Sequence, residues 1–175
     1  MTLPLEALPK RPLFMEKRGL TAAERGDAAH AFLRAVSLDA QDLDMARRIM
    51  VERGMLSVEQ AQALPMTKLE RMITSPLWKR MRAAQTLYRE RPFNLRVQEA
   101  GYTTLLQGVI DCCFLEAGEW VVVDFKSDRA GDPVALAERY GEQVALYARA
   151  LCEITGIPVR ERLLYLIEHE ETISV

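Results

Sequence analysis

The sequence predicts an α/β fold, and three patterns along the chain predict it. Helix-start signals recur between residues 21 and 85. From residue 86 the pattern changes to alternating and β-branched apolar residues, which is typical of strands. A long helical segment, 133–155, then precedes one more strand-like run. With 175 residues, 49% hydrophobic and 27% charged, the chain suits one globular domain and not a disordered or fibrous protein.

Capping patterns place the helices of the first half. Thr21, Ser57 and Thr67 each stand three residues before a Glu or Gln, the arrangement of a capping box. Ser75 before Pro76 predicts a further helix start, and Gly54 predicts a helix end. We expect helices at 22–36, 40–53, 58–64, 68–74 and 76–85. The proline-containing stretch 1–20 is interpreted as an N-terminal arm, and 21–175 as a single domain with a helical part (21–85) and a sheet-and-helix part (86–175).

Strand patterns dominate the second half. Residues 87–90 and 95–98 alternate like half-buried strands, and residues 103–115 are rich in β-branched and apolar side chains. A turn at 117–118 leads to a strand at 119–125, whose middle is apolar on both faces and is therefore expected to be central in a sheet. Asp132-Pro133 opens the helix 133–155, Gly156 and Pro158 close it, and a last strand is expected at 159–167.

Charge and cysteine content restrict the function classes. The 23 basic and 25 acidic residues give a net charge of −2, so a basic footprint over the whole protein is absent. Residues 68–91 are locally basic, which indicates either a DNA-guiding surface or a solvated helix face. The three cysteines form no C-x-x-C pair; this predicts buried thiols in a reducing, cytoplasmic compartment without a zinc site, cluster or disulfide. We expect no membrane span and no secretion signal.

Two aspartates and a lysine form the chemically informative pattern. Asp111 and Asp124 lie on the two predicted strands that the 117–118 turn joins, each after apolar residues that tie its backbone into the sheet. Lys126 follows Asp124 by two positions and so projects from the same strand face. Carboxylates and a backbone carbonyl, here that of Phe125, are ligands that Mg²⁺ prefers. An ammonium beside them can orient water and offset charge on a phosphate, which suits metal-assisted phosphodiester hydrolysis.

An ordinary structural interpretation competes with this one. A lone Asp-x-Lys at a strand end is far more often an exposed ion pair than a catalytic group. The second aspartate in the matching hairpin position favours the catalytic interpretation, and on these residues alone both remain open.

Further motifs give the pattern a family resemblance. The order Gly-x-Ile-Asp, hairpin, Val-Val-Asp-Phe-Lys-Ser resembles the RecB-type branch of the PD-(D/E)XK nuclease superfamily. In that branch a helix after the Asp-x-Lys strand carries Gln-x-x-x-Tyr, here Gln143 and Tyr147. An upstream helix carries Gly-x-x-x-His, here Gly26 and His30. The segments 11–26 and 88–93, the second with Glu90 in a Glu-x-Pro-Phe strand, are similar to AddA-type nuclease domains, so the resemblance covers residues 11–168.

The resemblance implies a fold and a set of roles. The fold is a restriction-endonuclease-like core with a mixed central sheet, flanked by the N-terminal helices and the helix 133–155. Asp111 and Asp124 are expected to bind Mg²⁺ or Mn²⁺ with help from His30, and Lys126 to position water. Gln143 and Tyr147, four apart on one helix face, are expected to organise the site or contact phosphate, with Glu90 in a supporting role. Gly26 is expected to clear space above the His30 imidazole.

The resemblance also implies a setting. It predicts a metal-dependent deoxyribonuclease, with exonuclease action, inside an ATP-dependent helicase–nuclease of double-strand break repair. The helicase is expected in the same polypeptide, delivering single-stranded DNA, together with a second subunit. No G-x-x-x-x-G-K-[ST] phosphate loop is present in this chain, so the motor must lie outside it. The alternatives are an inactive nuclease-fold interaction module, a stand-alone RecB-like or Cas4-like exonuclease, an RNA exonuclease, and a restriction-type endonuclease.

Overall fold

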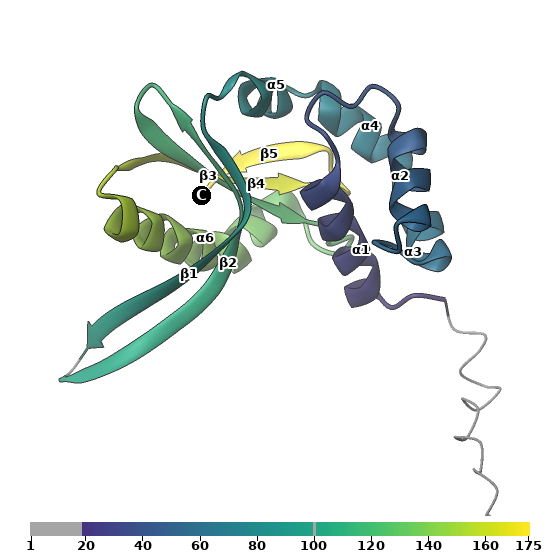
Figure 1. Ribbon diagram of the computed structural model, residues 1–175. Coiled ribbons are helices and arrows are strands. Elements are labelled where there is room, and N and C mark those ends of the chain that lie inside the picture. Colours follow the sequence, from purple (N-terminus) through teal and green to yellow (C-terminus); the bar gives the residue numbers. More distant parts are fainter. Residues whose placement is uncertain (1–18, 100) are drawn as a thin grey trace, which may run out of the picture.

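The computed structural model describes residues 19–99 and 101–175, so nearly all of the predicted arm, 1–20, lies outside the described residues. Helices and strands follow in the order of a helical half and a sheet half (Figure 1). This order confirms the α/β prediction. Among the described residues, no helix is both long enough and apolar enough to cross a bilayer.

Five short helices make up the first half: α1 (Ala22–Ala35), α2 (Leu43–Glu52), α3 (Val58–Ala63), α4 (Met66–Thr74) and α5 (Pro76–Ala83). The capping boxes at Thr21 and Ser57 form as predicted, and the Ser75 hydroxyl accepts from the Trp78 N–H with Pro76 in the first turn. The expected box at Thr67 is wrong. The chain already turns into α4 at Pro65, which leaves Thr67 inside the first turn.

The sheet contains five strands in their sequence order: β1 (Leu87–Glu99), β2 (Tyr102–Glu116), β3 (Glu119–Lys126), β4 (Val159–Leu166) and β5 (Glu171–Ser174). Neighbouring strands are antiparallel except β3 and β4, which are parallel because helix α6 (Pro133–Thr155) connects them. The mixed sheet and the long helix agree with the sequence. The last strand, β5, was not predicted, because four mostly polar residues carry little strand signal.

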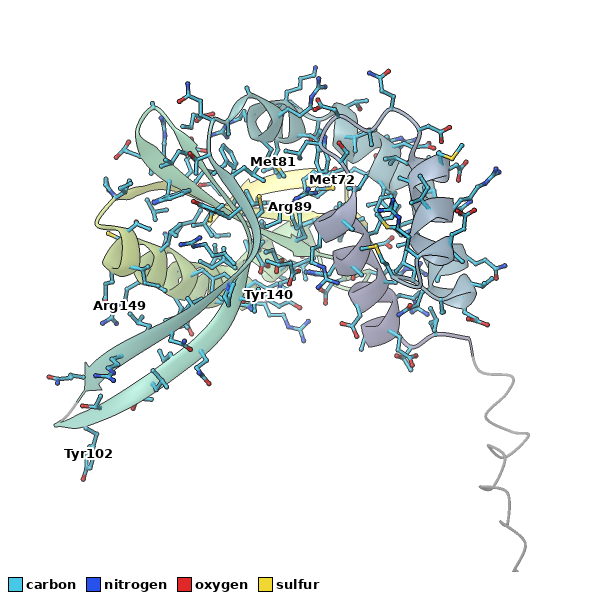
Figure 2. All side chains as sticks on the ribbon, viewed as in Figure 1. Met72, Met81, Arg89, Tyr102, Tyr140 and Arg149 are labelled. Atoms are coloured by element: carbon cyan, nitrogen blue, oxygen red, sulfur yellow. The ribbon has the colours of Figure 1, made fainter. Side chains whose placement is uncertain are left out.

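The first two strands form one long hairpin instead of the short segments expected. β1 runs unbroken through 87–99, where the sequence indicated two strands, because Arg91 and Pro92 keep their register with Ile110 and Val109. Pro92 lies on an edge strand, where a missing N–H is tolerated. Beyond the sheet the hairpin projects as an arm, with Tyr102 at its far end (Figures 1 and 2).

Two apolar layers cover the sheet. The helices α1–α5 pack with one face of β2–β4 through side chains such as Phe32, Trp78 and Phe114, and α6 packs on the other face through Leu136, Val144 and Leu151 (Figure 1). Side chains alternate between the two faces along β3, and this decides which layer each residue of the strand faces. Since Val121, Val123 and Phe125 belong to the first layer and Val122 to the second, Asp124 and Lys126 face α6.

Four of the seven basic side chains in the stretch 68–91 form ion pairs within the protein. They pair with acids from distant segments: Lys68 with Glu168, Arg71 with Glu170, Arg80 with Glu116 and Glu161, and Arg82 with Asp39. These pairs favour the interpretation of the stretch as a solvated helix face with structural ion pairs over its interpretation as a DNA-guiding surface. Cys112 and Cys113 are buried as expected, whereas Cys152 is exposed on α6, so the prediction of three buried thiols is wrong for that residue.

Arg89 attaches helix α1 to the sheet. Its guanidinium donates to the carbonyls of Leu33, at 2.8 Å, and Val36, at the C-terminal end of α1 (labelled in Figure 2). A cation there satisfies carbonyls that the helix leaves free and opposes the negative end of its dipole. Burial lowers the pKa of this guanidinium, which reflects how far it is removed from water.

We predict that Arg89→Leu destabilises the protein by about 2–3 kcal/mol, because two carbonyls lose a charged donor. The melting temperature should fall by roughly 4–12 °C. The exposed Arg96, on the same strand, supplies a matched control: Arg96→Leu should stay close to the parent. Equal melting temperatures for Arg89→Leu and the parent would contradict the anchoring role.

Candidate active site

The Asp111 carboxylate lies where strands β2 and β3 separate. Their ladder ends at the pair Cys112–Val123, so the next residues in register are Asp111 and Asp124. At that point the N–H of Phe125 donates to Oδ2 of Asp111 at 2.9 Å, in place of a ladder carbonyl. A backbone donor thus fixes the direction of a catalytic-type carboxylate on a rigid element.

Glu90 extends this row onto β1. The β1–β2 register passes from Arg89–Cys112 to Arg91–Ile110, which sets Glu90 opposite Asp111. Glu90 has a φ of 53°, a left-handed conformation that is costly for a residue with a side chain and is often found at functional sites. Three acidic residues from three adjacent strands therefore occupy one row of the sheet.

Burial and like charge act together on Asp111. Burial, with the neighbouring Asp124 carboxylate as the second cause, raises the pKa of Asp111 to about 6. His30, the Phe125 N–H and Lys126 act in the opposite direction and do not overcome these two causes. The site therefore holds negative charge at a cost, and a bound cation would relieve that cost.

Asp124 and Lys126 form a buried pair that is incompletely satisfied. Lys126 Nζ lies 3.0 Å from Oδ2 of Asp124, whose side chain is only 1% exposed. That same oxygen receives no hydrogen bond from the described residues. The oxygen is therefore balanced by the Lys126 charge without a well-directed hydrogen bond, which is unusual for a buried carboxylate. The exposed ion pair expected under the structural interpretation does not describe this pair.

The Gln-x-x-x-Tyr residues orient Lys126. Its Nζ donates to Oε1 of Gln143 at 3.1 Å, and Nε2 of Gln143 donates to the Tyr147 hydroxyl at 2.6 Å. The Gln143 amide is thereby held with its oxygen toward the ammonium. Burial, followed by the charge of Asp124, raises the pKa of Tyr147, which keeps the phenol neutral.

Packing connects Tyr147 to strands β1 and β2. The Tyr147 ring meets the Phe93 ring edge-on, with centroids 5.7 Å apart. Phe93 lies opposite Gly108, and a Cβ at Gly108 would stand 2.7 Å from the Phe93 ring. Glycine at 108 is therefore required for Phe93 to lie across β2 and support Tyr147.

Helix α1 brings a histidine to the row of acids. Nδ1 of His30 lies 3.6 Å from Oδ2 of Asp111. One ligand atom each from His30, Glu90 and Asp111 can be chosen so that all lie within 4.8 Å of one another, which is close enough to hold one metal ion. Asp124 stands outside that group, and its Oδ2 pairs with Lys126. The donor set of carboxylates and one imidazole fits Mg²⁺ or Mn²⁺; the Phe125 carbonyl as a ligand stays a prediction.

Gly26 has a different role from the one expected. A Cβ at Gly26 would lie 3.1 Å from Oγ of Ser127, so the glycine makes room for the loop after β3 and not for the imidazole of His30. Between this part of α1 and that loop lies a cleft of about 470 Å³, lined among others by Arg25, His30 and Lys126. The cleft gives the site an approach from outside.

Sequence reasoning missed the loop 127–132 and Tyr140 on α6. The Tyr140 hydroxyl donates to both carboxylate oxygens of Asp128 at 3.1 Å, and Nε2 of His169 lies 3.1 Å from the Gly131 carbonyl. Helical spacing was the available signal for Tyr140. It precedes Gln143 by three residues and Tyr147 by seven, which sets all three on one face of α6.

Comparison with known proteins agrees with this geometry. The family model described as the PD-(D/E)XK nuclease superfamily matches residues 5–174. Among curated proteins, the chain is similar to an ATP-dependent helicase/nuclease subunit from Acetivibrio thermocellus, with 38% identity over 177 aligned positions that cover 93% of this chain. Its counterparts from Pelotomaculum thermopropionicum and Geobacillus thermodenitrificans, which carry the same name, are 40% and 34% identical, over 90% and 94% of the chain.

These relatives are much longer than this chain. The aligned region spans 14%, 14% and 15% of the three relatives' own lengths. The similarity therefore concerns one domain-sized part of each relative.

We predict that Asp111→Asn stabilises the metal-free protein near neutral pH by about 1–3 kcal/mol. The folded-state pKa of Asp111, about 6, lies above the unfolded value of 3.8. Stability is therefore lost as the pH rises from about 4 to about 6, and the loss is complete above that range. Asn keeps an acceptor for the Phe125 N–H without the charge.

Thermal melts of both proteins in chelator, over a pH series, test this prediction. The variant should melt higher than the parent near neutral pH, and the difference should vanish below about pH 4. A variant that melts lower than the parent near neutral pH would show that the Asp111 charge is not a burden on the fold.

Proposed function

Because this chain belongs to the PD-(D/E)XK nuclease superfamily, we propose that it is a DNA-cleaving domain that hydrolyses phosphodiester bonds with a divalent metal ion. The observation that carries the proposal is the convergence at Asp111. One row of the sheet brings Glu90, Asp111 and Asp124 together, and Lys126 faces Asp124 at 3.0 Å.

The metal ligands we propose are Asp111 and Asp124, with His30 and Glu90 beside them and the Phe125 carbonyl as a further donor. The raised pKa of Asp111 and the buried Asp124 oxygen, which faces Lys126 without a well-directed hydrogen bond, support this choice. When bound, a divalent ion supplies a water of lowered pKa and offsets charge on the phosphate. Either Mg²⁺ or Mn²⁺ suits a set of oxygens with a single imidazole nearby.

Lys126 is assigned to the reacting centre. Its side chain is 15% exposed, and its ammonium is held by Asp124 and Gln143, so it stays in place without reorganisation. We propose that it orients the attacking water and stabilises the negative charge that develops on phosphate oxygens as the phosphorus–oxygen bond of the leaving strand breaks. Gln143 and Tyr147 position the ammonium, which is the site-organising role that the family resemblance implies for them beside phosphate contact.

The wider setting follows from the relatives and is also proposed. They are named as helicase/nuclease subunits and are several times longer than this chain. We propose that a helicase in the same polypeptide feeds single-stranded DNA to the cleft beside α1, that the domain acts as an exonuclease, and that a second subunit completes the assembly. Break repair in the bacterial cytoplasm is the setting that fits these names.

We predict that Lys126→Ala keeps the fold and divalent-ion binding but lowers the rate of DNA cleavage by about 10²–10³. The ammonium is not part of either apolar layer, and its removal leaves the carboxylates free for the ion. Asp124→Ala should instead lose both ion binding and cleavage. Calorimetric titration with Mn²⁺ and single-turnover cleavage, run on each variant, separate the two effects. Cleavage by folded Lys126→Ala at the parent rate would refute the assignment.

We predict that the 175-residue chain cleaves single-stranded DNA in Mg²⁺ or Mn²⁺ and not in excess chelator. Ca²⁺, with a larger and looser shell, should support binding with little turnover. Single-stranded DNA, duplex DNA and RNA of one sequence, compared side by side, test the substrate class. Preference for RNA would favour the RNA exonuclease, and the absence of any metal-dependent cleavage would favour an inactive interaction module.

A further inference from the structure

Tyr140 contacts the catalytic lysine although it lies outside the Gln-x-x-x-Tyr motif. Its ring centroid is 4.4 Å from Nζ of Lys126 (Tyr140 is labelled in Figure 2). An ammonium at that distance is attracted to the electron-rich face of the ring, and the attraction increases when water is excluded. Lys126 is 15% exposed, so this contact is largely shielded from solvent.

Asp128 fixes the ring from its other end. The Tyr140 hydroxyl donates to both oxygens of Asp128, each at 3.1 Å, across the start of the loop that follows β3. Burial, and then the Asp128 carboxylate, raise the pKa of Tyr140, which keeps the phenol as a donor. The ring is thus held by the α6 backbone on one side and by the loop on the other.

We propose that Tyr140 is a positioning residue for Lys126 and that Asp128 acts through Tyr140. The inference rests on the proposed function insofar as Lys126 takes part in cleavage. Three groups then enclose one ammonium: the Asp124 carboxylate at 3.0 Å, the Gln143 carbonyl at 3.1 Å and the Tyr140 ring.

The benefit of this arrangement is conformational. A lysine side chain has large rotamer freedom, and fixing it at the moment of reaction would add to the barrier. Asp124 and Gln143 are the two polar partners of the ammonium, and the Tyr140 ring is a third group in contact with it. The ammonium is therefore held before substrate arrives, facing Oδ2 of Asp124 at 3.0 Å.

Arg139, the neighbouring residue on α6, provides a matched control. Its guanidinium lies 5.6 Å from the same ring centroid, and it pairs with the same Asp128 at 3.7 Å. Its side chain is nevertheless 65% exposed, and its contacts reach the ring and Asp128 and not Lys126. Removing Arg139 tests the local charge and the packing of α6 without touching the lysine.

The experiment measures kcat and KM for single-stranded DNA cleavage in Mn²⁺ by the 175-residue chain. Tyr140→Leu should lower kcat by about 5- to 30-fold, with KM changed less than about twofold. Tyr140→Phe, which keeps the ring, should recover most of the loss, and Asp128→Asn should fall between the two. Arg139→Leu, which removes a contact to Asp128 and to the Tyr140 ring, should cause a smaller loss than Tyr140→Leu, and Arg149→Leu, on the same helix and paired only with Glu153 among the described contacts, should remain within about twofold of the parent. Melting temperature and Mn²⁺ affinity are recorded for every variant.

A double-mutant cycle separates positioning from a general structural effect. In a Lys126→Ala background, Tyr140→Leu should cause no further loss of rate, because its effect passes through the lysine. A loss of the same size in both backgrounds, or a parent-like kcat in Tyr140→Leu, overturns the inference.

An activity-independent measurement keeps the inference separate from the proposed function. In ¹³C-lysine-labelled protein, the Lys126 Hε protons should resonate upfield in the parent and in Tyr140→Phe, and should move toward the exposed lysines in Tyr140→Leu. Lys126→Ala assigns the signal. A parent that cleaves no DNA contradicts the proposed function alone, whereas an unchanged Lys126 signal in Tyr140→Leu contradicts the inference alone.

Discussion

The hydrogen bond from the Phe125 N–H to the Asp111 carboxylate is the interaction on which the site depends. It replaces a ladder contact at the point where β2 and β3 separate after the pair Cys112–Val123. The Asp111 carboxylate is thereby held between β2 and β3, opposite the buried Asp124 in the strand register. Two acids so close together are costly without a cation, and the raised pKa of Asp111 expresses that cost. The stability that the rest of the fold supplies keeps this arrangement in place.

The two layers on the sheet serve different parts of the site. On one face, α1 carries His30 to Asp111, and Arg89 holds the end of that helix against the sheet. On the other face, α6 presents Gln143 and Tyr147 to Lys126. The side chains from the two layers meet at the row of Glu90, Asp111 and Asp124, where the β2–β3 ladder ends. A change in the packing of either face therefore alters the geometry of this small group of side chains. The Gly108–Phe93–Tyr147 contact shows how a position on the β1–β2 hairpin reaches the residues that hold Lys126.

Much of this could be read from the sequence, for specific physical reasons. The helix limits at Thr21, Ser57, Asp132 and Gly156 follow from local capping chemistry, which acts over three or four residues. The shared face of Asp124 and Lys126 follows from strand alternation. What could not be predicted depends on contacts between distant segments. Four features arise only when separate elements meet: the continuous β1, the pairing of the basic stretch with distant acids, the proximity of Gly26 to Ser127, and the contact of Tyr140 with Lys126.

The most direct test of the account is a crystal structure of the protein with Mn²⁺, in which anomalous scattering locates the ion independently of the protein. The account predicts one strong peak between the Asp111 and Asp124 carboxylates, within bonding distance of both, with His30 or Glu90 on the same side. A Mn²⁺ ion found only elsewhere, or no peak between these carboxylates at an ion concentration that supports cleavage, would contradict the central claim.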